Sequence, residues 1–444
     1  MIPFTETPGS TLTPVLATGP TLDHATRPPR HAPETLRCSS TADFLAALPV
    51  LAGFTAENSL FIVCFQGSRG GNVIRIDLPP TDSPKATADF LNCVISLLKD
   101  TGAGAERPAM VITTCLSFAE TNDVPRGRLA QQLKRRFRRE GWRLRELAVI
   151  ASDGWCGLLG ESTKNARPLS EISQSPIAAK AQTHSRSVTD LATIGRLPQP
   201  DPLRSMAVQS QLHELQQRRL ARSTHPACGM PGSERSLLRI RQAASVADAC
   251  FKTVPGANVW ASEPTSISHE RERQAARPGV SERLLAKLID TAGHQSGWLV
   301  CVLTALTRAE FVIDISHETS ADRFTDIRLE SEPGAKPGTR EAWNIHHLLV
   351  SLAHEMPPHR RLRTVIAVAE DAIVHAPPES RPPLFAMLAW AWWAVGMQSV
   401  AARIAAEGLE TAPDHDLLLM VRRLCETPPA AHLLGLREEL ARAA

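Results

Sequence analysis

The fold class of this chain follows from the stretch SLFIVCFQGSRGGNVIRIDLPP, residues 59–80. An apolar run, residues 60–65, and a run that alternates apolar with charged residues, 73–78, flank a segment rich in glycine. Short runs of β-branched and aromatic residues around such a segment are typical of a β-hairpin. Pro79 and Pro80 end the second run, because proline donates no ladder hydrogen bond. The sequence therefore predicts two antiparallel strands here.

The next segments alternate between helical and strand patterns. The spacing of apolar residues predicts a helix over residues 84–99, a strand over 110–114, a helix over 126–140 and a strand over 144–150. Together with the hairpin, the element order is ββαβαβ, which is typical of an α/β layer with a mixed sheet. The expected fold class is an N-terminal mixed-sheet α/β domain followed by helices.

Four regions are expected along the chain. Residues 1–35 are rich in proline, threonine and glycine, a composition that buries too little apolar surface to fold, so we expect a disordered tail. The others are the α/β domain over 36–200, an interrupted helical region with linkers over 201–340, and a C-terminal helical region over 341–444. The helices expected in the middle region lie at residues 203–222, 236–252, 281–292 and 297–307.

The C-terminal region has the most regular pattern, in residues 384–413. Six positions there match the spacing of a tetratricopeptide unit of two antiparallel helices: Leu388, Trp392, Gly396, Ala401, Leu409 and Pro413. Gly396 and Ala401 would let the helices approach closely, and Pro413 would end the second one. A weaker copy at residues 348–377 and a closing helix near 431–442 would complete a short tetratricopeptide-like α-hairpin array.

Five separate segments carry a family resemblance: residues 46–54, 57–60, 75–79, 175–179 and 389–415. They resemble the opening, middle and ending of an actinobacterial family known as domain of unknown function 4192. Members often place a tryptophan and a cysteine cluster after the fourth strand. Here Trp155 and Cys156 stand without further cysteines nearby, so no metal or redox role is carried over. The resemblance implies the architecture, but no activity, cofactor or catalytic residue.

Composition excludes several classes of protein. A formal charge of +3 over 444 residues provides no global field toward nucleic acid or an anionic membrane. The nine cysteines are scattered without a Cys-x-x-Cys pair, which is typical of free thiols in a reducing compartment. The N-terminus has no signal-peptide pattern, and the longest apolar run, residues 384–397, is shorter than a membrane span. We expect a cytoplasmic protein without membrane contact.

The predicted helix over 126–140 is the strongest local electrostatic feature. Leu129, Leu133 and Phe137 recur every fourth residue and should face the sheet, which directs the basic side chains outward. Those are Lys134, Arg135, Arg136, Arg138 and Arg139, extended by Arg126, Arg128, Arg143 and Arg145. A solvated helix face and a site for phosphates or acidic partners both fit this pattern. No aromatic residue interleaves on that outer face, so base stacking is not indicated.

Three carboxylates, Glu57, Asp77 and Asp153, stand at predicted strand ends. If they converge at one sheet edge, they would suit a divalent ion or acid–base catalysis. Aspartates at strand ends also commonly accept hydrogen bonds from backbone amides. A hydrolase or transferase would need Asp77 and Asp153 within a few ångströms of each other.

Histidines and tryptophans supply two further candidate sites. His347 and His354 are two helical turns apart on one face, but zinc prefers spacing of i and i+4 with a third ligand, so a surface histidine cluster is the competing interpretation. Trp390, Trp392 and Trp393 would line either a ligand groove or the core.

No motif for a phosphate loop, a nucleophile elbow, a zinc protease or a dinucleotide fold occurs, so the sequence implies no cofactor. The leading hypothesis is a non-catalytic interaction or regulatory protein whose helical array holds a protein or peptide partner. One alternative is nucleic-acid association through the basic helix. Another is a hydrolase or transferase with carboxylates at the sheet edge.

Overall fold

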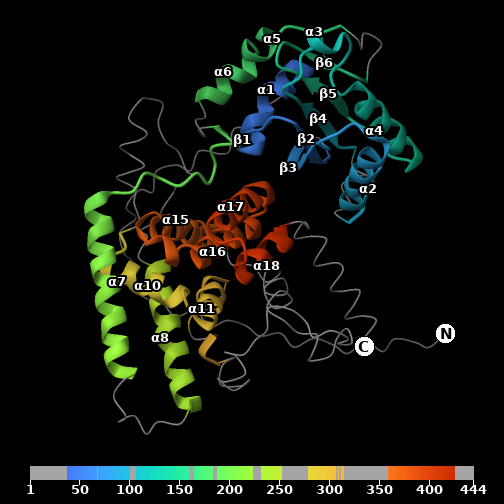
Figure 1. Ribbon diagram of the computed structural model, residues 1–444. Coiled ribbons are helices and arrows are strands. Elements are labelled where there is room, and N and C mark those ends of the chain that lie inside the picture. Colours follow the sequence, from blue (N-terminus) through green and yellow to red (C-terminus); the bar gives the residue numbers. More distant parts are fainter. Residues whose placement is uncertain are drawn as a thin grey trace, which may run out of the picture. The chain divides into compact units, whose positions relative to one another are not determined.

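Figure 1 shows the computed structural model of the chain. It describes residues 38–67, 69–100, 107–159, 165–183, 188–223, 232–252, 279–306, 309, 312–314 and 359–425. The predicted tail, the first helix of the weaker repeat, the closing helix, His347 and His354 lie outside these residues.

A five-stranded mixed sheet forms the N-terminal part of the described chain, in the order β3-β2-β4-β5-β6. Its strands are β2 (Ser59–Gln66), β3 (Arg69–Asp77), β4 (Ala109–Thr113), β5 (Glu146–Ile150) and β6 (Trp155–Gly157). β2 is antiparallel to both β3 and β4, β4 is parallel to β5, and β5 is antiparallel to β6. The predicted hairpin and the mixed α/β layer are confirmed.

Short strands were missing from the prediction. β6 has three residues, and a separate parallel pair, β1 (Phe54–Thr55) with β7 (Thr189–Asp190), has two residues per strand. Strands of this length are too short to show an alternating pattern.

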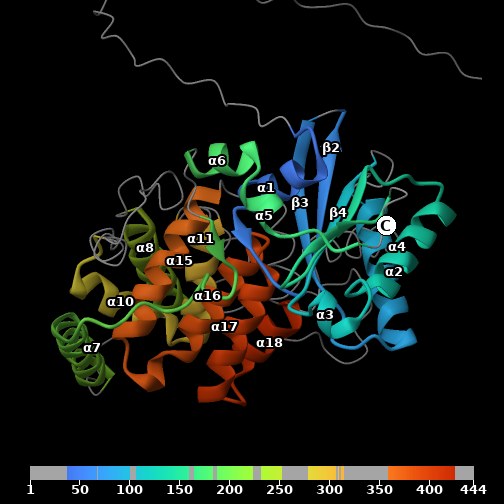
Figure 2. The ribbon, with the colours of Figure 1, turned by 90° about the horizontal axis from the view of Figure 1, so that it is seen from above.

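Helices cover the sheet, and the alternation of side chains along each strand sorts the core into two layers. On one face, Leu60, Met110 and Leu147 belong to a core with α2 (Pro84–Asp100) and α4 (Gly127–Arg139). The opposite positions, including Phe61 and Val111, belong to a second core that contains α1 (Thr41–Ala52). Because both faces of the sheet are buried, the sequence of β2 is a nearly continuous run of apolar residues. Figures 1 and 2 show α2 and α4 side by side.

Short helices complete this part of the chain. α3 (Phe118–Thr121) follows β4, and α5 (Ser170–Ser173) and α6 (Pro176–Thr183) contact α1. Asp43 at the start of α1 accepts hydrogen bonds from Ser39, Ser40 and, across the fold, the Ser175 hydroxyl at 2.8 Å. Ser40 caps α1, so one buried carboxylate fixes both the helix start and its contact with the 175 segment.

The rest of the described chain is helical, as predicted, and the middle helices lie within a few residues of their expected bounds. The middle helices are α7 (Pro202–Ser223), α8 (Gly232–Lys252), α10 (Glu282–Ala292) and α11 (Gln295–Leu306). The C-terminal helices are α15 (His359–His375), α16 (Pro382–Ala394), α17 (Gln398–Thr411) and α18 (Asp416–Cys425). α7 packs on α10, α8 on α11, and α15 to α18 contact one another in sequence. No helix among these residues combines the length and apolar content needed to cross a bilayer.

Helix α16 is buried at every position from Pro382 to Trp393. A helix that is apolar on all sides belongs in a protein interior. Trp390 and Trp393 have no exposed surface and Trp392 is 5% exposed. The three tryptophans therefore pack in the core and line no open groove.

The role of Gly396 differs from the expected one. It lies in the turn between α16 and α17 with φ of +85°, and a Cβ added there would contact nothing within 4 Å. Its function is to supply a left-handed backbone, not a close helix approach. Close approach occurs at Gly408, where a Cβ would lie 2.9 Å from Phe385 Cβ and from Leu418. Of the other predicted packing positions, Leu388 and Ala401 are buried, Leu409 is half-buried and Pro413 is exposed beyond the end of α17.

Candidate functional site

Helix α4 is held against the sheet by its apolar face, and its basic side chains lie on the other sides of the helix. Leu129, Ala130, Leu133 and Phe137 are buried in the core below the sheet, as the four-residue periodicity predicts. The Phe137 ring also meets Trp142, just past the helix, edge-on with centroids 5.4 Å apart. This burial fixes which side of the helix faces outward.

Four arginines, Arg128, Arg135, Arg138 and Arg139, are exposed on α4, and we call them the arginine face. Within the described residues none of the four forms an ion pair. At 100° per residue, Arg128, Arg135 and Arg139 fall within about 40° of one another and span about 16 Å along the axis. These three arginines thus form a narrow row of positive charge, and Arg138 lies about 60–100° around the helix from them.

Two of the predicted basic residues serve the fold instead. Lys134 is half-buried and its ammonium donates to the Leu158 carbonyl at 3.0 Å. Arg136 Nε pairs with Glu140 at 3.3 Å, and Glu140 also pairs with Lys99 of α2 at 2.8 Å. The Lys99 hydrogen bond, aided by the charge of Arg136, holds the pKa of Glu140 below its ordinary value. These contacts anchor α4 to α2 and to the segment after β6.

Two arginines that flank α4, Arg126 and Arg145, also contact other parts of the fold. Arg126 pairs with Asp82. Arg145 stacks over the Phe65 ring, 4.2 Å from its centroid, and donates to the Gly67 carbonyl at 2.7 Å, which supports the β2–β3 turn. The sequence could not separate these structural arginines from the arginine face, because the difference depends on partners far along the chain.

The three candidate carboxylates do not form one site. The strand register places Asp77 and Asp153 at the same end of the sheet, but β2 and β4 lie between β3 and β5, a separation of about 14 Å. Asp77 pairs with Arg75, and Glu57 is exposed. Asp153 accepts from the amides of Phe118 at 2.8 Å and Ala119 at 3.2 Å, at the start of α3.

These amide hydrogen bonds, that of Phe118 first, hold the pKa of Asp153 below its ordinary value. Asp153 therefore serves as a cap for backbone amides. Among the residues that the structure describes, no group of three or more His, Cys, Asp or Glu side chains is arranged to hold a metal ion.

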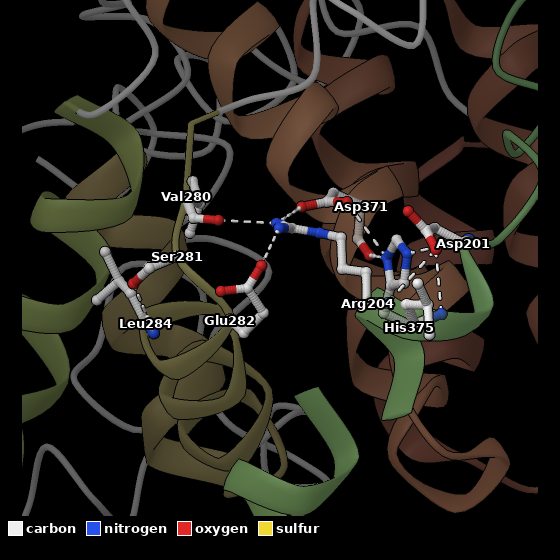
Figure 3. Close-up of polar contacts among 9 residues, drawn as sticks. Asp201, Arg204, Val280, Ser281, Glu282, Leu284, Asp371 and His375 are labelled. Carbon is white, nitrogen blue, oxygen red and sulfur yellow. Dashed lines mark hydrogen bonds and ion pairs between the residues drawn. The ribbon is translucent and has the colours of Figure 1, made fainter. Parts of the chain in front are cut away.

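A partly buried ionic cluster joins α7, α10 and α15 (Figure 3). Arg204 of α7 lies at its centre: Nη2 donates to Asp371 Oδ2 at 2.8 Å and to the Val280 carbonyl at 2.7 Å, and Nη1 donates to Glu282 Oε1 at 2.8 Å. Burial opposes the charge of Asp371, but hydrogen bonds from His375 and Arg204 outweigh it and hold its pKa below the ordinary value. Burial alone would lower the pKa of Arg204, but the hydrogen bond to Asp371 and the negative charges of Asp371 and Glu282 outweigh it and raise the pKa.

His375 completes the cluster and is 1% exposed. Its Nδ1 contacts the Asp371 carbonyl at 2.8 Å and Oδ1 at 3.2 Å, so this nitrogen carries the proton. Its Nε2 accepts from the Asp201 amide at 3.3 Å. A catalytic His–Asp pair must leave the second nitrogen open to a reacting group. Here both nitrogens are occupied, so the cluster holds three helices together.

No local pattern in the sequence indicates this cluster, because Arg204 and Asp371 are 167 positions apart and neither belongs to a local motif. The arginine face, in contrast, was visible from periodicity and charge alone. The structure thus leaves the arginine face as the candidate functional site.

Comparison with known proteins adds a family. Residues 42–293 match the family model described as Domain of unknown function (DUF4192). No curated protein and no solved structure matches the chain. The matched range contains the sheet, the arginine face, Arg204 and Glu282, whereas Asp371 and His375 lie beyond its end. Since this range covers more than half of the 444 residues, the chain belongs to the DUF4192 family.

Proposed function

We propose that this chain is a non-catalytic binding protein that holds an anionic partner against the arginine face. One observation carries the proposal: four exposed guanidinium groups lie on one anchored helix, and within the described residues none has an ion-pair partner. A guanidinium group offers paired donors that match carboxylate and phosphate oxygens. Between residues 127 and 139 the helix carries no acidic residue that would neutralise them.

The separation of Asp77 from Asp153 and the enclosed nitrogens of His375 support a binding role over a catalytic one. Neither group is placed to act on a bound substrate.

Heparin provides a direct test, because it is a dense polyanion without base or peptide chemistry. We expect the wild-type chain to bind a heparin column and the Arg135→Gln/Arg139→Gln variant to elute at clearly lower salt. A matched control, Arg218→Gln/Arg422→Gln, removes the same charge from exposed positions on α7 and α18 and should elute with the wild type. Equal elution of all three proteins would refute the proposal.

A second candidate function, a protein or peptide partner on the helical part, is favoured by a separate observation. Leu203 and Met206 lie one turn apart on α7 and are 78% and 69% exposed. Two exposed apolar side chains on one helix face offer a small apolar surface to a partner. We propose that α16 and α17 form a tetratricopeptide-like pair that supports this part from within, because α16 is buried throughout.

This second candidate is tested by substitution, since deleting residues 341–444 would remove Asp371 and leave Arg204 without its buried partner. A pull-down from the source cells should lose its specific partners with Leu203→Ser/Met206→Ser and keep them with Gln209→Ser/His213→Ser, two exposed polar positions on α7. Identical recovery with both variants would exclude this surface.

We also propose a cytoplasmic location and an actinobacterial source. The eight cysteines in the described part of the chain are free thiols, and Cys38, Cys93 and Cys115 are exposed, which favours a reducing compartment. The resemblance to an actinobacterial family supports the source.

A further inference from the structure

We propose that the anionic partner of the arginine face is double-stranded DNA, contacted mainly through its phosphates. This inference rests on the proposed anion-binding function and narrows it to one ligand.

The arginine face lacks the apolar surface of a protein interface. The apolar side chains of α4, Leu129, Ala130, Leu133 and Phe137, are all buried in the core that α4 shares with the sheet. The exposed side chains of the helix are arginines and two glutamines, Gln131 and Gln132. The centre of a protein–protein interface is apolar and depleted in charge, whereas interfaces with nucleic acid are polar and strongly positive. The composition of this face therefore favours nucleic acid over an acidic protein.

The same helix lacks the stacking groups of a single-strand binder. Proteins that bind single strands stack the bases on exposed aromatic rings. On α4 the one aromatic residue, Phe137, is 1% exposed, and the adjacent Trp142 is half-buried and packs against it. A ligand whose bases are already paired and stacked needs no such platform.

The dimensions of the arginine face suit a duplex backbone. Its row of about 16 Å runs beside about nine phosphates of B-form DNA, which carries one charge per 1.7 Å of axis. Gln131 and Gln132 lie between Arg128 and Arg135, where their amides are placed to donate to phosphates or to adenine edges. The major groove of B-form DNA admits a helix, whereas the deep and narrow major groove of duplex RNA does not.

The face is also held in place before any ligand binds. The contacts of Lys134 with Leu158 and of Glu140 with Lys99 of α2 tie α4 to its neighbours. Only the flexible guanidinium side chains then lose freedom on binding.

Fluorescence anisotropy on the full chain tests the inference with four labelled probes: a 20-base-pair DNA duplex, a 20-nucleotide oligo-dT strand, a 20-base-pair RNA duplex and an oligoglutamate peptide. We expect the DNA duplex to bind most tightly. Four phosphate contacts predict a slope of log K against log salt of about −3.6, so the affinity should fall about 150-fold between 50 and 200 mM salt.

Matched variants assign the contacts. Arg135→Gln/Arg139→Gln should reduce the magnitude of this slope by about 2, Arg135→Lys/Arg139→Lys should keep most of it, and Arg218→Gln/Arg422→Gln should leave it unchanged. Far-ultraviolet circular dichroism checks that the variants keep their helices.

The alternative results separate the two proposals. If heparin binds through Arg135 and Arg139 but the DNA duplex does not, or if another probe binds as tightly as the duplex, the DNA assignment is overturned and the anion-binding function stands. If neither heparin nor DNA binds at 50 mM salt, both are wrong. Duplex binding with an unchanged slope in the Arg135→Gln/Arg139→Gln variant would also overturn the assignment.

Discussion

Arg204 and Asp371 are 167 residues apart in the sequence, yet Arg204 Nη2 donates to Asp371 Oδ2 at 2.8 Å inside the helical part of the chain. Asp371 is 5% exposed and the Arg204 side chain 15% exposed. Arg204 also donates hydrogen bonds to the Val280 carbonyl and the Glu282 carboxylate. A single side chain of α7 therefore contacts both α10 and α15. This contact links the part of the chain that matches DUF4192 to the C-terminal helix α15.

The first prediction concerns this pair. Asp371→Asn should lower the free energy of unfolding by about 3 kcal/mol, because it removes the buried carboxylate partner of a largely buried guanidinium. Glu282→Gln should cost less than about 1 kcal/mol, since the Glu282 side chain is 44% exposed and solvent screens its charge. Urea denaturation measures both. Equal losses for the two variants would show that Asp371 is not the main partner.

The second prediction is a dependence of stability on pH through Asp43. Hydrogen bonds from Ser39, then Ser175, lower the Asp43 pKa to about 2. A carboxylate whose pKa is lower in the folded than in the unfolded chain stabilises the fold fully above the unfolded value of about 3.9. That contribution is lost as the pH falls from about 4 toward 2. Wild-type stability should therefore fall more steeply over this window than that of Asp43→Asn, and parallel curves from acid denaturation would contradict the assignment.

The third prediction separates two glycines. Gly408→Ala places a methyl group 2.9 Å from Phe385 Cβ and from Leu418, so it should destabilise the chain by about 1–3 kcal/mol through overpacking. At Gly396 there is space but φ is +85°, so alanine should cost about 1 kcal/mol and asparagine less, because asparagine tolerates the left-handed region. Thermal unfolding of the three variants gives the order. A harmless Gly408→Ala would contradict the close packing of α16, α17 and α18.

The fourth prediction is that substitutions of exposed arginines on α4 weaken heparin binding without lowering the stability of the chain. Arg128→Gln/Arg135→Gln should change the free energy of unfolding by less than about 0.5 kcal/mol, because both side chains are exposed and make no ion pair within the described residues. The same variant should bind heparin more weakly. Chemical denaturation and heparin elution are compared on the same samples, and a stability loss equal to that of Arg136→Gln would assign these arginines to the fold.

Local patterns in the sequence were enough to predict part of this structure. The β2–β3 hairpin and the buried face of α4 depend on periodicities of two and of about four residues, which a short window contains. Strand order is not local: Asp77 and Asp153 share a sheet end, but only the insertion of β2 and β4 between their strands shows that they are apart. The roles of Gly396 and Gly408 likewise depend on a backbone angle and on contacts with another helix.

The arginine face shows the same limit within a single helix. Its residues were predicted from charge. Glu140 stands four residues after Arg136, so that ion pair is local, but the separation of Arg135 and Arg139 from Lys134 required the position of Leu158. Charge density identified the helix, and tertiary contacts identified which charges are free to bind.

The salt concentration that elutes the chain from heparin tests the central claim most directly. We predict that wild type and the Arg218→Gln/Arg422→Gln control elute together and that Arg135→Gln/Arg139→Gln elutes at clearly lower salt, because it loses half of the arginine face. Coelution of all three proteins, with their helices intact by circular dichroism, would contradict the account.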